Sequence, residues 1–116
     1  VDKVVLDCLQ FPLQHQATAQ DYMALITWLF QLGGPCFQFA MQLNNWTSEG
    51  RLAIHTHAWW NSPCYFDQMP SELKKVYAQA DLAILIGSLN LRRLTLDNPQ
   101  AEAEPDSFPC PFHLLA

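Results

Sequence analysis

Residues 82–86 are apolar without a break, and Gly87 then separates them from a polar segment with helical spacing. A short uninterrupted run of this kind is typical of a strand buried on both faces, as in a parallel sheet covered by helices. Gly87 and Ser88 are therefore predicted to form the turn at the carboxyl end of a central strand. In open α/β sheets, ligands bind at this place because strand ends and helix amino termini converge there.

The first part of the chain predicts a strand followed by a helix. Residues 3–9 begin with β-branched side chains and are closed by Pro12, which favours a strand. Thr18 is a suitable helix cap, and Asp21 at the third helical position completes a capping-box pattern. Residues 33–35, Gly-Gly-Pro, end this helix. Its apolar positions predict burial over most of its surface: Tyr22, Leu25, Ile26, Trp28, Leu29 and Leu32.

The middle of the chain continues with a second helix over residues 36–46 and a second strand over residues 51–57, where apolar and polar positions alternate. An irregular aromatic loop follows over residues 59–69. Ser71 is then expected to cap a short helix that reaches residue 80, with Leu73, Val76 and Tyr77 pointing inward. A last helix is predicted to begin near residue 89.

The order strand, helix, helix, strand, helix, strand, helix predicts an α/β fold, in which a partial doubly wound, Rossmann-like and mostly parallel sheet is flanked by helices. Residues 1–97 are expected to form a single α/β domain. With about three strands the sheet is incomplete, so we expect another chain or additional sequence to cover its open edge. Residues 98–116 hold several prolines and acidic residues and are expected to form an extended tail.

Composition restricts the possible partners. The chain of 116 residues is half hydrophobic, has 15% charged residues and carries a net charge of −5. This charge disfavours a nucleic-acid backbone as a partner. The large apolar fraction in so small a unit instead favours contact with other protein chains.

Four widely spaced cysteines, Cys8, Cys36, Cys64 and Cys110, form no Cys-x-x-Cys motif, which favours reduced thiols. An intracellular, reducing compartment is therefore expected, and cytoplasm and organelle interior both remain open. No signal peptide is recognisable, and the longest apolar stretch, residues 23–30, is too short to span a membrane. Because position 1 is Val, either a segment was removed or the chain begins inside a longer one.

One stretch resembles the strand, turn and helix signature of the metal-dependent damage-control phosphatases, in the sugar-phosphate phosphatase branch once described as acidic-residue methyltransferases. The signature reads Ala-Asp-Leu, an apolar pair, then Phe-Lys-Gly-Asp-Leu-Asn-Tyr-Arg-Lys-Leu. Matching positions are Ala80, Asp81, Leu82, Gly87, Leu89, Asn90, Arg92 and Leu94. The preceding segment shares its order of residues with the family at His55, His57, Trp60, Pro63, Tyr65, Met69 and Pro70. The resemblance covers most of the chain and implies the carboxyl-terminal part of the family domain.

This chain departs from the family pattern at the charged positions. Ile86 stands where the family has Lys, and Ser88 stands where it has Asp. Near Pro12, where the family carries a metal-binding Asp, residues 13–17 contain no carboxylate. The family's other metal motif, Asp-Asn-Ala-Gly, corresponds to sequence upstream of this chain. A divalent cation requires anionic oxygen ligands, and a transferred phosphoryl group requires positive charge, so the catalytic positions are degenerate.

The candidate phosphate-binding turn consists of Gly87, Ser88, Asn90 and Arg92, because backbone N–H groups and polar side chains at a helix start bind anions. The alternative is that Ser88 only caps the helix. Arg93 follows Arg92, and helical spacing directs the two side chains differently, so at most one would reach a cleft.

Other candidates lie upstream of this turn. His55 and His57 would share one face of a strand and are weak zinc candidates, and a structural histidine pair is the alternative. His57 with Cys64 would be a nucleophile pair only with an orienting group that the sequence does not reveal. The aromatic loop offers four residues as a protein interface: Trp59, Trp60, Tyr65 and Phe66.

Two functions follow from these observations. The first is a pseudoenzyme, a catalytically degenerate phosphatase-like domain that acts as a structural or accessory subunit of a larger assembly and needs no cofactor. The second is a metal-dependent damage-control phosphatase that hydrolyses small sugar phosphates with Mg²⁺ or Mn²⁺. The missing charges at residues 86 and 88 favour the first.

Overall fold

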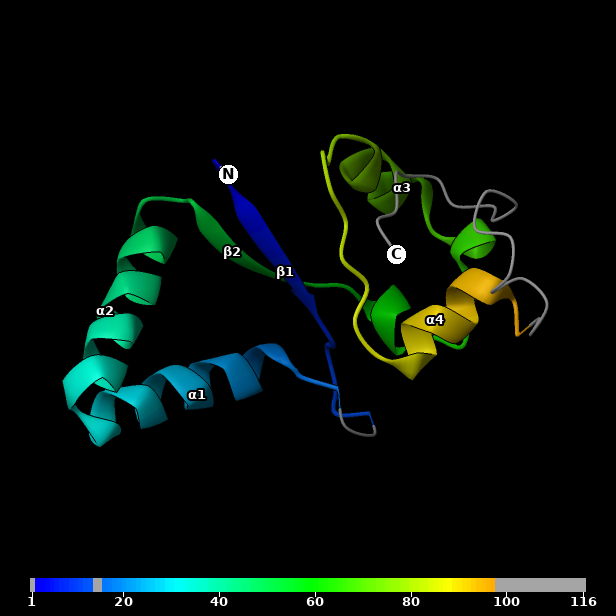
Figure 1. The fold of residues 1–116 in the computed structure, drawn as a ribbon. Coiled ribbons are helices and arrows are strands. Elements are labelled where there is room, and N and C mark those ends of the chain that lie inside the picture. Colours follow the sequence, from blue (N-terminus) through cyan, green and yellow to red (C-terminus); the bar gives the residue numbers. More distant parts are fainter. Residues whose placement is uncertain (1, 14–15, 98–116) are drawn as a thin grey trace. The chain divides into compact units, whose positions relative to one another are not determined.

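The computed structural model describes residues 2–13 and 16–97 (Figure 1). The chain divides into two compact units, Val1–Asn61 and Ser62–Ala116, and each unit is described by itself. The predicted single domain over residues 1–97 stays a prediction. The predicted tail, residues 98–116, lies outside the described residues.

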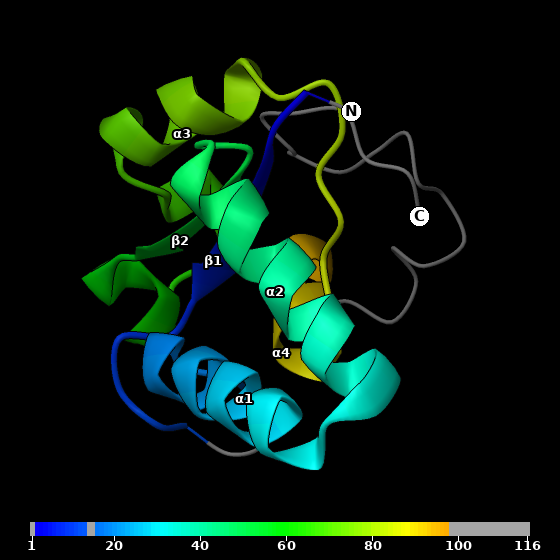
Figure 2. The same cartoon turned by 90° about the vertical axis from the view of Figure 1, so that its left-hand side faces the viewer.

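Two parallel strands and two helices between them form the first unit. Strand β1 (Val4–Cys8) is followed by helices α1 (Ala19–Leu32) and α2 (Gly34–Ser48) and then by strand β2 (Leu52–Thr56). The register places Val4 opposite Leu52 and Cys8 opposite Thr56. Parallel neighbours need a long crossover, which the two helices supply. Figure 2 shows both helices in front of the two strands, and α1 and α2 both contact β2.

The predicted capping box at the start of α1 is confirmed. Thr18 donates from its backbone N and its Oγ1 to Asp21 Oδ2, both at 2.8 Å, and Asp21 N donates to Thr18 Oγ1 at 3.2 Å. These bonds hold the pKa of Asp21 below its ordinary value, because they favour the ionised carboxylate. Gly33 separates α1 from α2 with φ of 71°, a backbone conformation that glycine adopts without strain.

The expected burial of most of α1 is wrong. Ile26 is buried, whereas Leu25, Trp28 and Leu32 are exposed. The physical reason is that α2 and β2 cover one side of this helix, and its apolar residues extend around both sides. The same holds for α2, in which Ala40 is buried and Phe39 is exposed.

The loop after β1 is attached to the end of this unit by a single side chain. Asn61 Oδ1 accepts hydrogen bonds from the backbone N of Gln10 at 2.8 Å and of Phe11 at 3.2 Å, and Asn61 Nδ2 donates to Phe11 O at 2.8 Å. One amide therefore satisfies two donors and one acceptor on a segment about fifty residues away, as a neighbouring strand would.

The second unit is built around short helices. The 3₁₀ turn η2 (Phe66–Gln68) precedes α3 (Ser71–Ala78) and α4 (Ser88–Thr95). Ser71 is the first residue of α3 rather than its cap, a position that Pro70 takes. The buried residues of the second unit include Phe66, Met69, Ala83 and Leu94.

The predicted central strand is the main difference from the sequence-based expectation. In the part of the chain that the structure describes, residues 82–86 belong to no strand, and the two-stranded sheet consists of β1 and β2. Ala83 is buried, but Ile84 is 71% and Ile86 78% exposed. Residues 82–86 thus have apolar side chains on both sides, and only the side that contains Ala83 is buried. The chain is a mixed helix and strand protein with a parallel sheet, compatible with the α/β class, and its described residues form no doubly wound sheet.

Among residues 2–13 and 16–97, no helix has the length and hydropathy needed to cross a membrane.

Candidate functional site

Gly87 opens α4 and shapes the candidate phosphate-binding turn. Its φ of 97° is a conformation that residues with a Cβ rarely adopt, and it occupies the N-cap position. Gly87 O accepts hydrogen bonds from Asn90 N at 3.1 Å and Leu91 N at 3.2 Å. Ser88 is the first helical residue, and no side chain caps the helix. The expected alternative, in which Ser88 is the cap, is therefore wrong by one position.

The half-buried side chain of Asn90 forms hydrogen bonds to residues on both sides of the turn. Its Nδ2 donates to Ile86 O at 2.9 Å, and its Oδ1 accepts from Arg93 Nη1 at 3.3 Å. Both ends of the amide are thus used by the chain itself. Asn90 is a structural link between residues 82–86 and α4. An incoming ligand would have to replace these bonds.

Arg93 is the buried cation of this unit. The residue is 1% exposed, and its Nη2 donates to Ser62 O. Burial lowers its pKa because it disfavours the charged form, while a nearby Cys64 acts in the opposite direction. The guanidinium remains protonated, since even a lowered arginine pKa lies far above neutral pH. Arg93 therefore fastens α4 to the segment before η2.

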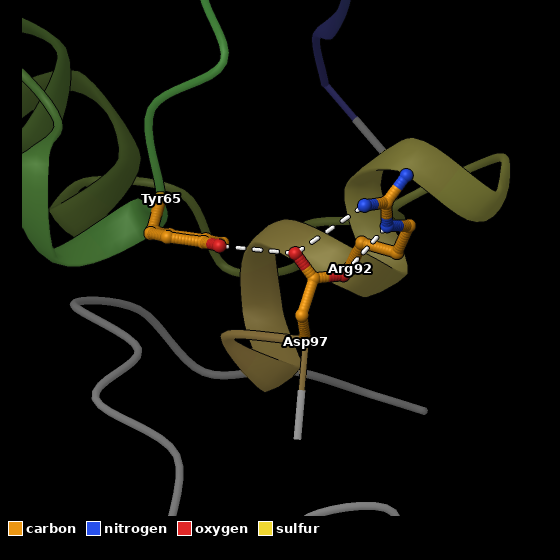
Figure 3. Close-up of polar contacts among 3 residues, drawn as sticks. All are labelled: Tyr65, Arg92 and Asp97. Atoms are coloured by element: carbon orange, nitrogen blue, oxygen red, sulfur yellow. Dashed lines mark hydrogen bonds and ion pairs between the residues drawn. The ribbon is translucent and has the colours of Figure 1, made fainter. Parts of the chain in front are cut away.

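Arg92 points away from Arg93, in agreement with the expected divergence of the two side chains. Its Nε lies 2.6 Å and its Nη2 3.4 Å from the two carboxylate oxygens of Asp97. Tyr65 donates its hydroxyl to Asp97 Oδ2 at 3.0 Å, so that the carboxylate lies between the phenol and the guanidinium (Figure 3). We call these three residues the Asp97 cluster.

Hydrogen bonds are the largest cause of the pKa shifts in the Asp97 cluster. The hydrogen bonds from Arg92 and then Tyr65 lower the pKa of Asp97. The same contacts raise the pKa of Tyr65 and of Arg92, because each side chain loses its proton less readily while it donates a hydrogen bond to a carboxylate. Arg92 is therefore neutralised by Asp97, and its charge is not directed at the turn.

Asp97 and Ser62 were not singled out in the sequence, and the only signal for Asp97 is its position five residues after Arg92.

Tyr65→Phe is expected to raise the pKa of Asp97 part of the way towards its ordinary value, and Arg92→Gln to raise it further, because Arg92 is the larger cause. A carboxylate with a lowered pKa stabilises the fold above its ordinary pKa, and this contribution is lost as pH falls through the lowered value. Carboxyl ¹³C NMR titration of Asp97 measures both shifts. An Asp97 that titrates identically in wild type and both variants would contradict the observed contacts.

A divalent metal does not fit the described residues of the turn. Residues 86–91 contain no carboxylate, and Asp97, which follows α4, is held by Arg92 and Tyr65. In the described part of the chain, no three histidine, cysteine or acidic residues gather in a metal-binding arrangement. Hard cations require several anionic oxygen ligands, so no metal-dependent step is assigned to these residues.

The two candidate histidines, His55 and His57, belong to the first unit. His55 is exposed on β2, and His57 follows the strand. Trp59 N donates to His57 Nδ1 at 3.0 Å, so this nitrogen is occupied and the ring proton is assigned to Nε2. His57 and Cys64 lie in different units, and their proposed pairing stays a prediction.

The four candidate interface aromatics are largely covered. Trp59 and Trp60 are buried and meet edge to face, with ring centroids 4.9 Å apart. Phe66 is buried, and Tyr65 is half-buried in the Asp97 cluster. Their role as an interface stays a prediction.

The first unit has two parallel strands joined by helices, and the second has a glycine turn that opens a helix; both are compatible with the α/β class. The family model described as the damage-control phosphatase ARMT1-like domain matches residues 1–115. The chain therefore belongs to this family, as its resemblance to the signature predicted. No curated protein matches the chain.

Proposed function

We propose that this chain is a catalytically degenerate member of its family and serves as a structural or accessory subunit that binds other protein chains. The main support for the proposal is that neither arginine of α4 is available to a ligand and that the turn before it has no acidic side chain. Arg92 is neutralised by Asp97, Arg93 is buried, and the turn has no carboxylate. Such a turn lacks both the ligands for a divalent cation and a free positive charge for a phosphoryl group.

The departures from the family signature support the same proposal. Ile86 replaces a lysine, and its side chain is 78% exposed, so an apolar group stands where a cation would contact phosphate. Ser88 replaces the aspartate that follows the glycine. The lysine and the aspartate are lost together, so neither charge remains at the turn without its opposite partner. This joint loss agrees with relaxed selection for catalysis. We further propose that the chain corresponds to the carboxyl-terminal part of the family domain.

The proposed partners are proteins and not nucleic acids, because the net charge of −5 repels a phosphate backbone. We also propose an intracellular, reducing location. Cys8, Cys36 and Cys64 carry free thiols, which agrees with such a location.

The second candidate function is metal-dependent hydrolysis of small sugar phosphates, which family membership favours. It requires Mg²⁺ or Mn²⁺ ligands on sequence other than the described residues. Backbone N–H groups at the start of α4 would then hold the phosphate.

The experiment that separates the two uses the natural protein at its full length. Phosphate release from hexose phosphates is measured with Mg²⁺ or Mn²⁺, with and without EDTA, and Mn²⁺ binding is followed by calorimetry. We expect neither phosphate release nor Mn²⁺ binding. Chelator-sensitive release would overturn the proposal and establish the phosphatase.

A double variant tests the role of the missing charges. Ile86→Lys combined with Ser88→Asp restores the signature at both positions, and we expect it to release no phosphate, because residues 13–17 still offer no carboxylate. Recovery of activity in this double variant would show that the other ligands are present.

Mass measurement of the natural protein with its copurifying chains is expected to show a complex.

A further inference from the structure

Helix α4 ends in a backbone conformation that is unfavourable for the residues that adopt it. Leu96 has φ of 54° and ψ of 33°, and Asp97 has φ of 56°, both in the left-handed region. Within the described residues, these are the two positions other than glycine with positive φ. A residue with a Cβ meets the following carbonyl in this conformation, and helices therefore commonly end on glycine here. The last turn of α4 is thus strained.

Neither burial nor the backbone hydrogen bonds explain why leucine keeps this conformation. Leu96 is 41% exposed, so its side chain gains little from the interior. The backbone N–H groups of Leu96 and Asp97 both donate to Arg92 O, and the bond from Asp97 is 3.2 Å long. A glycine at position 96 would form the same bonds without strain. Strained backbone persists only where surrounding contacts determine it.

The Asp97 cluster supplies such contacts. Arg92 on α4 and Tyr65 before η2 both donate to the carboxylate of Asp97, which fixes the residue after Leu96 from two sides (Figure 3). The side chains of Arg92 and Asp97 are 65% and 38% exposed, so water and salt reach the ion pair. The cluster is therefore able to open while the buried Arg93 still fastens α4 to its unit.

We propose that the Asp97 cluster is a latch: the charged carboxylate of Asp97 holds the end of α4 in its strained conformation, and loss of this charge lets the last turn relax. Leu96 then returns to negative φ. Opening also leaves Arg92 as an exposed cation, because the same carboxylate is its counter-charge. The inference concerns the end of α4 and does not depend on the proposed lack of catalysis.

The groups that face Asp97 give the direction of the pH dependence. Arg92 on α4 and then Tyr65 before η2 lower the pKa of Asp97 through hydrogen bonds, and Asp67 in η2 acts on Tyr65. A carboxylate with a lowered pKa stabilises the fold above its ordinary pKa of about 3.9. The latch is therefore closed at neutral pH and opens as pH falls through the lowered value.

Amide hydrogen exchange of the full chain, followed by NMR, tests the latch. Asp97→Asn removes the charge and keeps the shape of the side chain. We expect the protection of the Leu96 amide to fall about two- to fivefold, as for the loss of an exposed ion pair. The Leu91 amide at the start of α4, which donates to Gly87 O, is expected to keep its protection, because the release is local.

The matched control is Asp81→Asn, which removes the same charge from another exposed position of the second unit. It is expected to leave the Leu96 amide unchanged. A Leu96 amide that is equally protected in wild type and Asp97→Asn overturns the proposal, and so does an equal loss at Leu91 and Leu96.

A second pair of variants tests the strain and does not depend on the charge. Leu96→Gly removes the Cβ at the left-handed position, and we expect the protection of the Asp97 amide to rise about three- to tenfold. Leu96→Ala keeps the Cβ and is expected to give no rise. The absence of a gain with glycine, or an equal gain with alanine, overturns the proposal.

The pH dependence provides a further readout in the wild-type protein. The backbone resonance of Leu96 is expected to move towards its position in Asp97→Asn as pH falls through the lowered pKa of Asp97. Asp97→Asn itself is expected to show no such step. A step in both proteins, or in neither, overturns the proposal.

Discussion

Phe66→Ala is expected to lower the free energy of unfolding by about 3–5 kcal/mol, the usual cost of removing a buried phenyl ring. Phe66 is 1% exposed and lies at the start of η2, so its truncation leaves a cavity. Because small domains are stable by only about 5–15 kcal/mol, this loss is a large fraction of the total. Urea unfolding followed by circular dichroism measures it.

The matched control for this truncation is Phe39→Ala, on the exposed side of α2. Removal of an exposed ring is expected to change the free energy of unfolding by less than about 0.5 kcal/mol. Phe66→Leu keeps most of the buried volume and is expected to cost about 1.5 kcal/mol. Equal effects of the two alanine substitutions would show that Phe66 is not buried in solution.

Arg93→Met is expected to destabilise the protein by about 2–3 kcal/mol. The methionine keeps the apolar part of the side chain, but Ser62 O and Asn90 Oδ1 each lose a donor. Arg93→Lys retains the charge without the fork of N–H groups, and it is expected to recover only part of the loss. The shift in urea midpoint at constant slope measures both effects.

The neighbouring arginine provides the control for Arg93. Arg92 pairs with Asp97 at the surface, and its side chain is 65% exposed. Solvent-exposed ion pairs contribute little, so Arg92→Met is expected to cost less than about 1 kcal/mol. A larger loss for Arg92 than for Arg93 would reverse the assignment of the two side chains and contradict the structure.

Local chemistry explains which elements could be predicted from the sequence. The Thr18 and Asp21 pair specifies a helix start through bonds that form within four residues, and it is present as predicted. The two strands and the two helices of the first unit also lie close to their predicted bounds, because apolar periodicity depends mainly on local backbone geometry. The family followed from the signature around Gly87.

Tertiary contacts explain what could not be predicted. An apolar run such as residues 82–86 indicates a tendency to be buried, but a strand exists only when a neighbour accepts its hydrogen bonds. Helical spacing showed that Arg92 and Arg93 diverge, yet not which one is buried. That outcome depends on Ser62 and Asp97, whose contacts arise only in the folded second unit.

The parallel pairing of β1 with β2 also affects the order in which the protein can fold during synthesis. Val4 pairs with Leu52, so each residue of β1 leaves the ribosome about 48 residues before its partner. At translation speeds of about 5–20 residues per second, β1 waits roughly 2–10 s for β2. The helical hairpin formed by α1 and α2 needs no such delay, because its contacts are local. A chain truncated before residue 52 therefore contains both helices of the hairpin, but its β1 has no strand to pair with.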